Sequence, residues 1–287
     1  MGRNTDTSVT RILAILESFD GREPELSLAD VARLTRMSKP SAHRFLQALR
    51  GARCVVQDPA SRRYRMGPRV FELGMAFQRH LDVRREALPA MHRLRDLFGE
   101  TVVLSALLDG WLVVVDQVTS HFEIKLTQET GRRYAPTAGA TGRVLLAFLP
   151  PVEQERVIEA HAAGAPARER QRLLDRLVAV RSVGMDVSAS ERIVGALALA
   201  GPVWGQHEQP VAALSITGPI SRFTPETFAR AVPGLKRALD QVSAELGGAA
   251  ASRRHPLPSL QRGGDAHASL TAAFRQITGG KPDQERG

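Results

Sequence analysis

The 287-residue sequence predicts an α+β fold in two domains: a small, basic, helical domain followed by a larger domain built on an antiparallel sheet. The length favours two domains, at about 100–200 residues each. The formal charge of +9 is unevenly spread, because residues 1–80 carry 14 basic and 8 acidic residues whereas residues 81–248 carry 19 of each. Helical periodicity dominates the first part, and strand patterns separated by turn residues dominate the second.

The first domain begins with three short amphipathic segments. Residues 8–19 carry apolar side chains at helical spacing, and residues 28–34 repeat the pattern behind a serine that is a typical N-cap. A short turn at 35–37 precedes a third helix at 39–50, whose N-cap is Ser38. Two short helices joined by a tight turn are typical of a helix-turn-helix.

A hairpin follows the third helix. Residues 54–57 and 62–66 have strand character and flank the turn sequence Asp-Pro-Ala-Ser at 58–61. The layout predicts a winged helix-turn-helix over 1–69, which places the start of its third helix in the major groove of double-stranded DNA. A protein-interaction domain with a solvated basic face is the alternative. The candidate DNA-binding residues are Lys39, Ser41, His43, Arg44, Gln47, Arg62 and Arg63.

A helix over 70–82 is expected to link the two domains. Val70, Leu73, Phe77 and Leu81 recur along it at steps of three and four. Such a stripe between domains is suited to pairing with its own copy in a dimer.

Among the DNA-binding candidates of the third helix, Arg44 and Gln47 are suited to contact base edges.

The second domain spans 83–248 and mixes strands with helices. Its clearest signal is Asp109-Gly110, a typical hairpin turn between two apolar runs. Strands, a helical insertion, further strands and a closing helix indicate one α+β domain and no βαβ repeat. The expected helices are 83–98, 142–148, 152–162, 168–183 and 225–246, and the expected strands are 101–108, 111–118, 122–126, 184–188, 195–203 and 210–217.

Several classes of protein are excluded by what the sequence lacks. A single cysteine, Cys54, provides no disulfide framework and no cysteine-based zinc site. No apolar run approaches the ~18–20 residues of a membrane span, and residues 1–6 form no signal-peptide core. The glycine-bearing segment 139–142 lacks the lysine of a phosphate-binding loop, and no nucleophile elbow is present. We therefore expect a cytoplasmic protein with no metal, cofactor, membrane attachment or catalytic activity.

Several separate segments, in the right order, resemble the IclR family of transcriptional regulators. The resemblance covers roughly 8–247. Its motifs are TRILAIL at 10–16, LADVA at 28–32, SKPSAHRFL at 38–46, YRMG at 64–67, GATGRVLLA at 139–147 and LSITGP at 214–219.

The resemblance implies a GAF-like C-terminal domain that binds an effector and mediates oligomerisation. It implies a homodimer or a dimer of dimers whose operator binding is modulated by a small organic acid, carboxylic or aromatic. Two backbone amides at the start of a helix would suit a carboxylate, and two hydroxyls would point from one face of a strand. The residues implied as effector-binding are Ala140, Thr141, Ser188, Ala198, Ser215 and Thr217.

The chief alternative is a non-specific architectural DNA-binding protein without an effector. It would account for the basic N-terminal part, but it leaves the neutral second domain and its loop motif without a role. Residues 249–287 carry six basic and three acidic residues and are rich in Gly, Ala, Ser, Pro and Arg. We expect this basic tail to be disordered, with residues 270–277 as the one candidate for a brief helix.

Overall fold

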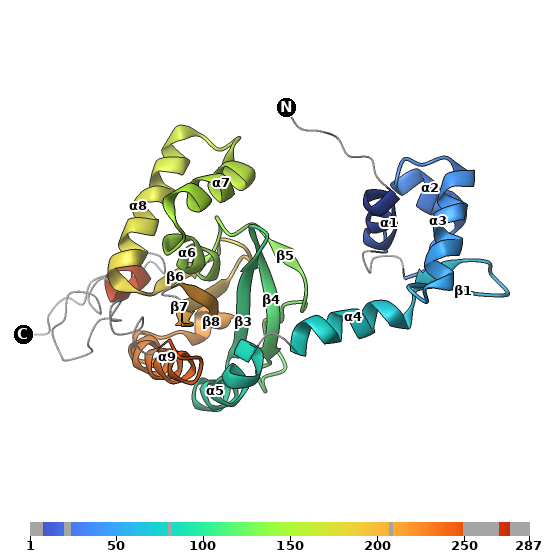
Figure 1. Cartoon of the computed structure of the whole chain (residues 1–287). Helices are drawn as coiled ribbons and strands as arrows, with labels where there is room; N and C mark the ends of the chain where they lie inside the picture. The colour runs from blue at the N-terminus through green and yellow to red at the C-terminus, as the bar shows by residue number, and fades with distance from the viewer. Residues whose placement is uncertain (1–7, 20–23, 80–81, 207–208, 249–269, 276–287) are drawn as a thin grey trace, which may run out of the picture. The chain divides into compact units, whose positions relative to one another are not determined.

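The computed structural model describes residues 8–19, 24–79, 82–206, 209–248 and 270–275. The chain divides between Leu81 and Asp82 into two compact units, and each is considered by itself (Figure 1). Leu81, the last residue of the expected linker stripe, lies outside the described residues, as do residues 1–6. Among the described helices, none combines the length and apolar character needed to cross a membrane.

The first unit contains the three short helices and the two-stranded hairpin that the sequence predicts, followed by a fourth helix. Ser27 and Asp30 form a capping box at the second helix: the Asp30 amide donates to the Ser27 hydroxyl, and the Asp30 carboxylate accepts from the Ser27 amide. Apolar side chains from all three helices and the hairpin form one core, which includes Ile15, Val31 and Phe45. The elements are α1 (Ser8–Glu17), α2 (Leu28–Leu34), α3 (Lys39–Gly51), β1 (Val55–Gln57), β2 (Tyr64–Met66) and α4 (Pro68–Arg79).

The second unit contains an antiparallel sheet in the strand order β5-β4-β3-β8-β7-β6. The predicted hairpin is confirmed, because Asp109 and Gly110 both have positive φ, at 48° and 76°, as a tight two-residue hairpin turn requires. The strands are β3 (Thr101–Leu108), β4 (Trp111–Val118), β5 (Arg133–Tyr134), β6 (Asp186–Ala189), β7 (Ala196–Trp204) and β8 (Pro210–Pro219).

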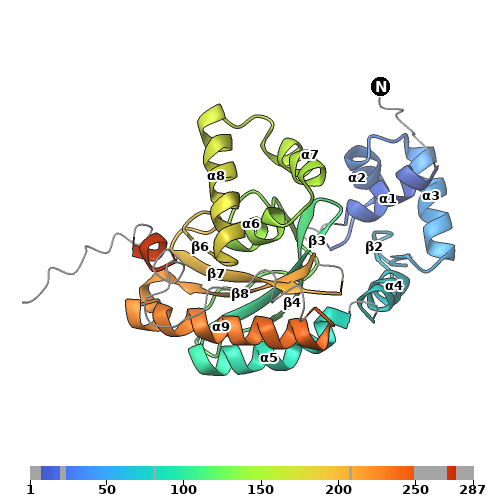
Figure 2. The same ribbon diagram turned by 60° about the vertical axis from the view of Figure 1, so that its left-hand side comes forward.

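Helices cover both faces of this sheet. On one face α5 (Asp82–Phe98) and α9 (Pro225–Glu245) lie side by side (Figure 2). Gly201 of β7 allows α9 to pack closely on the sheet, since a Cβ atom at position 201 would lie 2.3 Å from Leu239 Cδ1 of α9. On the other face lie α6 (Ala140–Ala147), α7 (Pro151–Ala162) and α8 (Ala167–Val183), with α6 nearest the strands. The predicted α+β class, with an antiparallel sheet in the second unit, is confirmed.

The expected strand at 122–126 is wrong. Those residues form bends and irregular backbone, and the edge of β4 pairs instead with Arg133–Tyr134. Arg222, which ends the short 3-10 helix Ile220–Arg222, holds the segment: its guanidinium lies over the Phe122 ring and donates to the Ile124 carbonyl at 3.0 Å. Apolar character alone therefore misled the prediction, because these tertiary contacts replace strand pairing.

The tail is ordered where it meets the second unit. Residues 270–275 are helical, with Leu270 and Phe274 buried. The Phe274 ring stacks on Phe228 of α9, with centroids 4.3 Å apart. The candidate helix at 270–277 is thus present at 270–275, where the expectation of disorder is wrong, because two apolar side chains four residues apart pack on α9. The other tail residues lie outside the described part of the chain.

Candidate functional site

The outer face of α3 presents the polar side chains that the sequence predicts to contact DNA. Lys39, His43 and Arg44 are exposed, and Ser41 and Gln47 are half-buried, because the opposite stripe of the helix is buried in the core of the first unit. The α3 N-terminus is capped by Ser38, whose hydroxyl accepts from the Ser41 amide at 3.4 Å. An exposed polar stripe at the start of a capped helix has the form of a recognition helix.

The two candidates for base contact on this stripe, Gln47 and Arg44, differ in the contacts that they already make. Gln47 Nε2 and His43 Nε2 lie 3.2 Å apart in a hydrogen bond. The Arg44 guanidinium stands 5.1 Å from the centroid of the Phe45 ring, and it forms no ion pair with any described residue. Arg44 therefore keeps its charge and its donors available for a base or a phosphate.

The two arginines predicted at the tip of the wing, Arg62 and Arg63, have different surroundings. Arg62 is exposed and adopts a positive φ of 59° in the turn between β1 and β2. Arg63 instead lies 3.7 Å from the Asp30 carboxylate of α2, in an ion pair. Two amides of the turn, those of Ala60 and Ser61, donate to Asp58 Oδ1 and hold the tip in shape. Arg62 is therefore the more available of the two cations.

A pocket opens in the second unit where the start of α6 meets the strands β6, β7 and β8. It encloses about 410 Å³ of empty space, counting the part open to solvent. Of the six residues predicted to bind effector, Ser215 is the one that does not line it. The lining residues are Gln128, Gly139, Ala140, Thr141, Ser188, Glu191, Arg192, Ile193, Ala196, Leu197, Ala198 and Thr217.

Strand register brings three of the predicted residues into one row. Ser188 of β6 pairs with Ala198 of β7, which pairs with Thr217 of β8, so their side chains share one face of the sheet. Thr217 Oγ1 donates to the Leu197 carbonyl at 3.1 Å. Ser215 belongs to the next row of the same face, is 1% exposed, and has a hydroxyl without a hydrogen-bond partner among the described residues.

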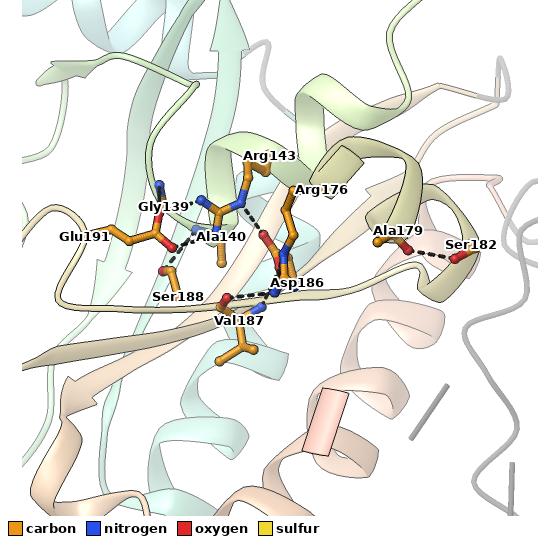
Figure 3. A network of polar contacts seen from close by, with 10 residues as sticks. All are labelled: Gly139, Ala140, Arg143, Arg176, Ala179, Ser182, Asp186, Val187, Ser188 and Glu191. Carbon is orange, nitrogen blue, oxygen red and sulfur yellow. Dashed lines mark hydrogen bonds and ion pairs between the residues drawn. The ribbon is translucent and has the colours of Figure 1, made fainter. Parts of the chain in front are cut away.

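The expected carboxylate cradle at the start of α6 is partly filled by the protein itself. The Ala140 amide donates to Ser188 Oγ at 3.0 Å, and the Gly139 amide donates to Glu191 Oε2 at 3.0 Å (Figure 3). Of the two amides expected to hold a carboxylate, those of Ala140 and Thr141, the Ala140 amide is not free to receive a ligand unless Ser188 moves. The positive end of the helix dipole still faces the pocket.

A network of ion pairs joins α6, α8, β6 and the segment after β6, and it adjoins the pocket through Glu191 (Figure 3). Arg143 of α6 is its centre: Nε lies 2.6 Å from Asp186 Oδ2, and the two Nη atoms reach the two oxygens of Glu191 at 2.5 and 3.0 Å. Arg176 of α8 donates to the other Asp186 oxygen at 2.8 Å. Two cations and two carboxylates therefore neutralise one another.

Sequence reasoning missed the charged members of this site. Glu191 was not among the predicted site residues, yet it both pairs with Arg143 and lines the pocket. Arg192 and Gln128 also line the pocket and were not anticipated. No local signal identifies them, because Arg143 and Glu191 lie 48 residues apart in sequence. The one available hint was Arg143 itself, a single charged residue that needs a carboxylate partner because its helix, α6, is buried along its whole length.

The pKa of Glu191 provides a test of the network. Burial raises the pKa of this carboxyl, but hydrogen bonds and charge from Arg143 outweigh it, so the pKa lies below the ordinary value of 4.5. A lowered folded-state pKa stabilises the protein above pH 4.5, and the stabilisation is lost as the pH falls through the lowered value. We expect Glu191→Gln to be less stable than the parent near pH 7 in urea unfolding. The gap should narrow below pH 4.5; a gap independent of pH would contradict this.

A helix-turn-helix with a basic wing, joined to a domain that holds a small-molecule pocket, defines a DNA-binding regulator that responds to a ligand. Residues 8–59 match the family described as the IclR helix-turn-helix domain, and residues 75–244 match that of the bacterial transcriptional regulator IclR C-terminal domain. The chain therefore belongs to the IclR family of bacterial transcriptional regulators.

Known relatives agree with this assignment. The HTH-type transcriptional regulator KdgR of Escherichia coli is 29% identical over 245 residues, which cover 84% of this chain and 93% of KdgR. A solved structure of an IclR transcriptional regulator from Silicibacter is 25% identical and has a TM-score of 0.73 over 84% of this chain and 97% of that one. The IclR homolog from Microbacterium hydrocarbonoxydans complexed with 4-hydroxybenzoate, 20% identical, shares the fold at a TM-score of 0.71 over 84% and 99%.

Proposed function

We propose that a small organic acid bound in the pocket changes the affinity of the N-terminal unit for a double-stranded operator. The observation that carries this is the pocket itself. It places hydroxyl groups from β6 and β8, apolar side chains from β7, and the positive end of α6 around one space. That mixture suits a molecule with an apolar body and an anionic end.

The DNA half of the proposal rests on the exposed stripe of α3 and the wing. Arg44 and Gln47 would contact base edges, whereas Lys39 and Ser41 would contact phosphates. His43 supports Gln47 through their hydrogen bond. The two wing arginines discussed above would meet the backbone or the minor groove. Regulation without catalysis in the cytoplasm is the role we propose for the whole chain.

Self-association is part of the proposal. The first unit leaves large apolar side chains in solvent: Val9 and Leu13 on α1 are 65% and 52% exposed, and Phe71 and Leu73 on α4 are 72% and 52% exposed. Apolar side chains gathered on two helices of a small unit are suited to burial against a second copy. A homodimer would present two recognition helices to a palindromic operator.

The test begins with DNA selected by the full chain from a random pool and then footprinted. A protected palindrome with half-sites about one helical turn apart is expected. Uniform binding to any duplex would favour an architectural protein instead. Titrating organic acids against the selected duplex should then change its apparent affinity, which fluorescence anisotropy measures.

Ala198→Leu is the variant that ties this response to the pocket. Ala198 lines the pocket, so a larger side chain fills space that a ligand needs. We expect the variant to bind the selected duplex within about threefold of the parent, and to lose the response to acid. Ala179→Leu is the control, since Ala179 is exposed on α8. A normal response in Ala198→Leu would place the effector site elsewhere.

A further inference from the structure

Arg192 stands at the wall of the pocket without a carboxylate partner. It lines the pocket and is half-buried. Arg143, Arg176 and Arg222 of the same unit each pair with a buried carboxylate, on Asp186 or Glu100. Within the described part of the chain Arg192 has no such ion pair.

Neutral groups hold the Arg192 side chain in place. Its guanidinium lies 3.9 Å from the centroid of the Tyr134 ring and donates to Gln128 Oε1 at 3.2 Å. The backbone of Gln128 is itself held against Gln117 of β4: its N–H donates to Gln117 Oε1 at 2.9 Å, and its carbonyl accepts from Gln117 Nε2. The cation is therefore oriented before any ligand arrives.

The stem of Arg192 also crosses the start of α6. A Cβ atom on Gly139 would lie 3.1 Å from Arg192 Cδ, and Gly139 has a φ of +84°, which favours glycine. The absence of a side chain at 139 thus lets Arg192 lie against the N-terminus of the helix. The guanidinium and the helix dipole add their positive potentials at this side of the pocket.

The charged side chains around the pocket have a net positive charge. Glu191 and Arg192 are the charged residues among those that line it. The Glu191 carboxylate is already neutralised, since Arg143 reaches both of its oxygens and the Gly139 amide donates to one. Burial lowers the pKa of Arg192, and the nearby charge of Arg132 adds to this. A partly desolvated cation next to uncharged side chains is suited to an anionic ligand.

We propose that Arg192 is the residue that selects effectors by their carboxylate, binding it through the guanidinium while Leu197, Ile193 and Ala198 contact the apolar body. This inference rests on the proposed function and adds its specificity-determining group. A planar guanidinium offers two parallel donors to a carboxylate, and a neutral amide of the same shape matches them poorly. The pocket therefore discriminates acids from their amides.

The experiment compares acids with their own primary amides on the full chain. The probes are pyruvate, benzoate and 4-hydroxybenzoate, each with its amide, measured by titration calorimetry and by thermal shift. The parent should bind at least one acid more tightly than its amide. In Arg192→Gln the acid should bind about 10- to 100-fold more weakly, and the amide should change less than about threefold.

Arg132→Gln is the matched control. Arg132 also stands over the Tyr134 ring, at 5.6 Å, but it is exposed and does not line the pocket. It should keep the preference of the parent for acids. Arg192→Lys should retain part of the preference, because the charge remains and the fork of donors is lost. Circular dichroism confirms that each variant is folded at the temperature of the titration.

The possible failures are distinguishable. If the parent binds an acid and Arg192→Gln binds it equally well, the role of Arg192 is overturned while the proposed function stands. An equal loss of acid and amide in Arg192→Gln would show a structural role and also overturn the inference. If no probe binds the parent, an acid effector of these classes is contradicted, and the inference falls with it.

Discussion

Replacing Arg143 by Met is expected to lower the free energy of unfolding by about 3–5 kcal/mol. Arg143 is 7% exposed and pairs with Asp186, which is 1% exposed, and with Glu191. The substitution preserves much of the apolar stem but leaves Glu191 without its cation and Asp186 with Arg176 alone. The physical reason for the loss is that the buried Asp186 keeps only one of its two cations, while Glu191, 36% exposed, loses its bidentate partner. Urea unfolding followed by circular dichroism measures it.

Arg170→Met is the control for this prediction. Arg170 of α8 also pairs with two carboxylates, Glu155 and Glu159, but these side chains are 60% and 64% exposed. Its removal should cost less than about 1 kcal/mol, because water screens the charges that remain. Arg143→Lys should fall between the two, since one ammonium cannot serve both carboxylates as the guanidinium does. Equal losses in Arg143→Met and Arg170→Met would contradict a buried network.

Replacing Arg44 by Ala is expected to weaken binding to the selected operator by about 10- to 100-fold, which corresponds to ~1–3 kcal/mol. The reason is that Arg44 is exposed in the N-terminal half of α3, with no ion pair among the described residues to satisfy its donors. Its guanidinium can bind both acceptors of a guanine edge. Fluorescence anisotropy with the selected duplex and with a scrambled duplex separates loss of specificity from loss of charge.

Arg50→Ala tests whether any arginine on the same helix would do. Arg50 is exposed in the last turn of α3, where its guanidinium donates to Gln57 Oε1 at 3.2 Å. Arg50→Ala should leave the ratio of the affinities for the selected and the scrambled duplex unchanged, because phosphate contacts act on all sequences alike. If Arg44→Ala weakens both duplexes equally, Arg44 binds the backbone and reads no base.

Local sequence determined most of the elements. Ser27 and Ser38 mark where helices begin, and Asp109-Gly110 marks a hairpin whose strands begin and end where the pattern places them. These features depend on the chemistry of neighbouring residues, which is why a sequence shows them. The motif starting at Gly139 and the alternation in β8 also pointed to residues of the pocket, through the resemblance to a known family.

Tertiary structure alone decided which charges meet. The pairing of Arg143 with Glu191, the stacking of Arg192 on Tyr134 and the docking of Phe274 on Phe228 join residues far apart in the chain. It also decided that 122–126 would not pair as a strand. Amino-acid patterns report neighbours along the chain, whereas burial and Coulombic interaction depend on distance in space. The sequence by itself therefore identified the regulator and its two units, and the fold decided which charged side chains line the pocket.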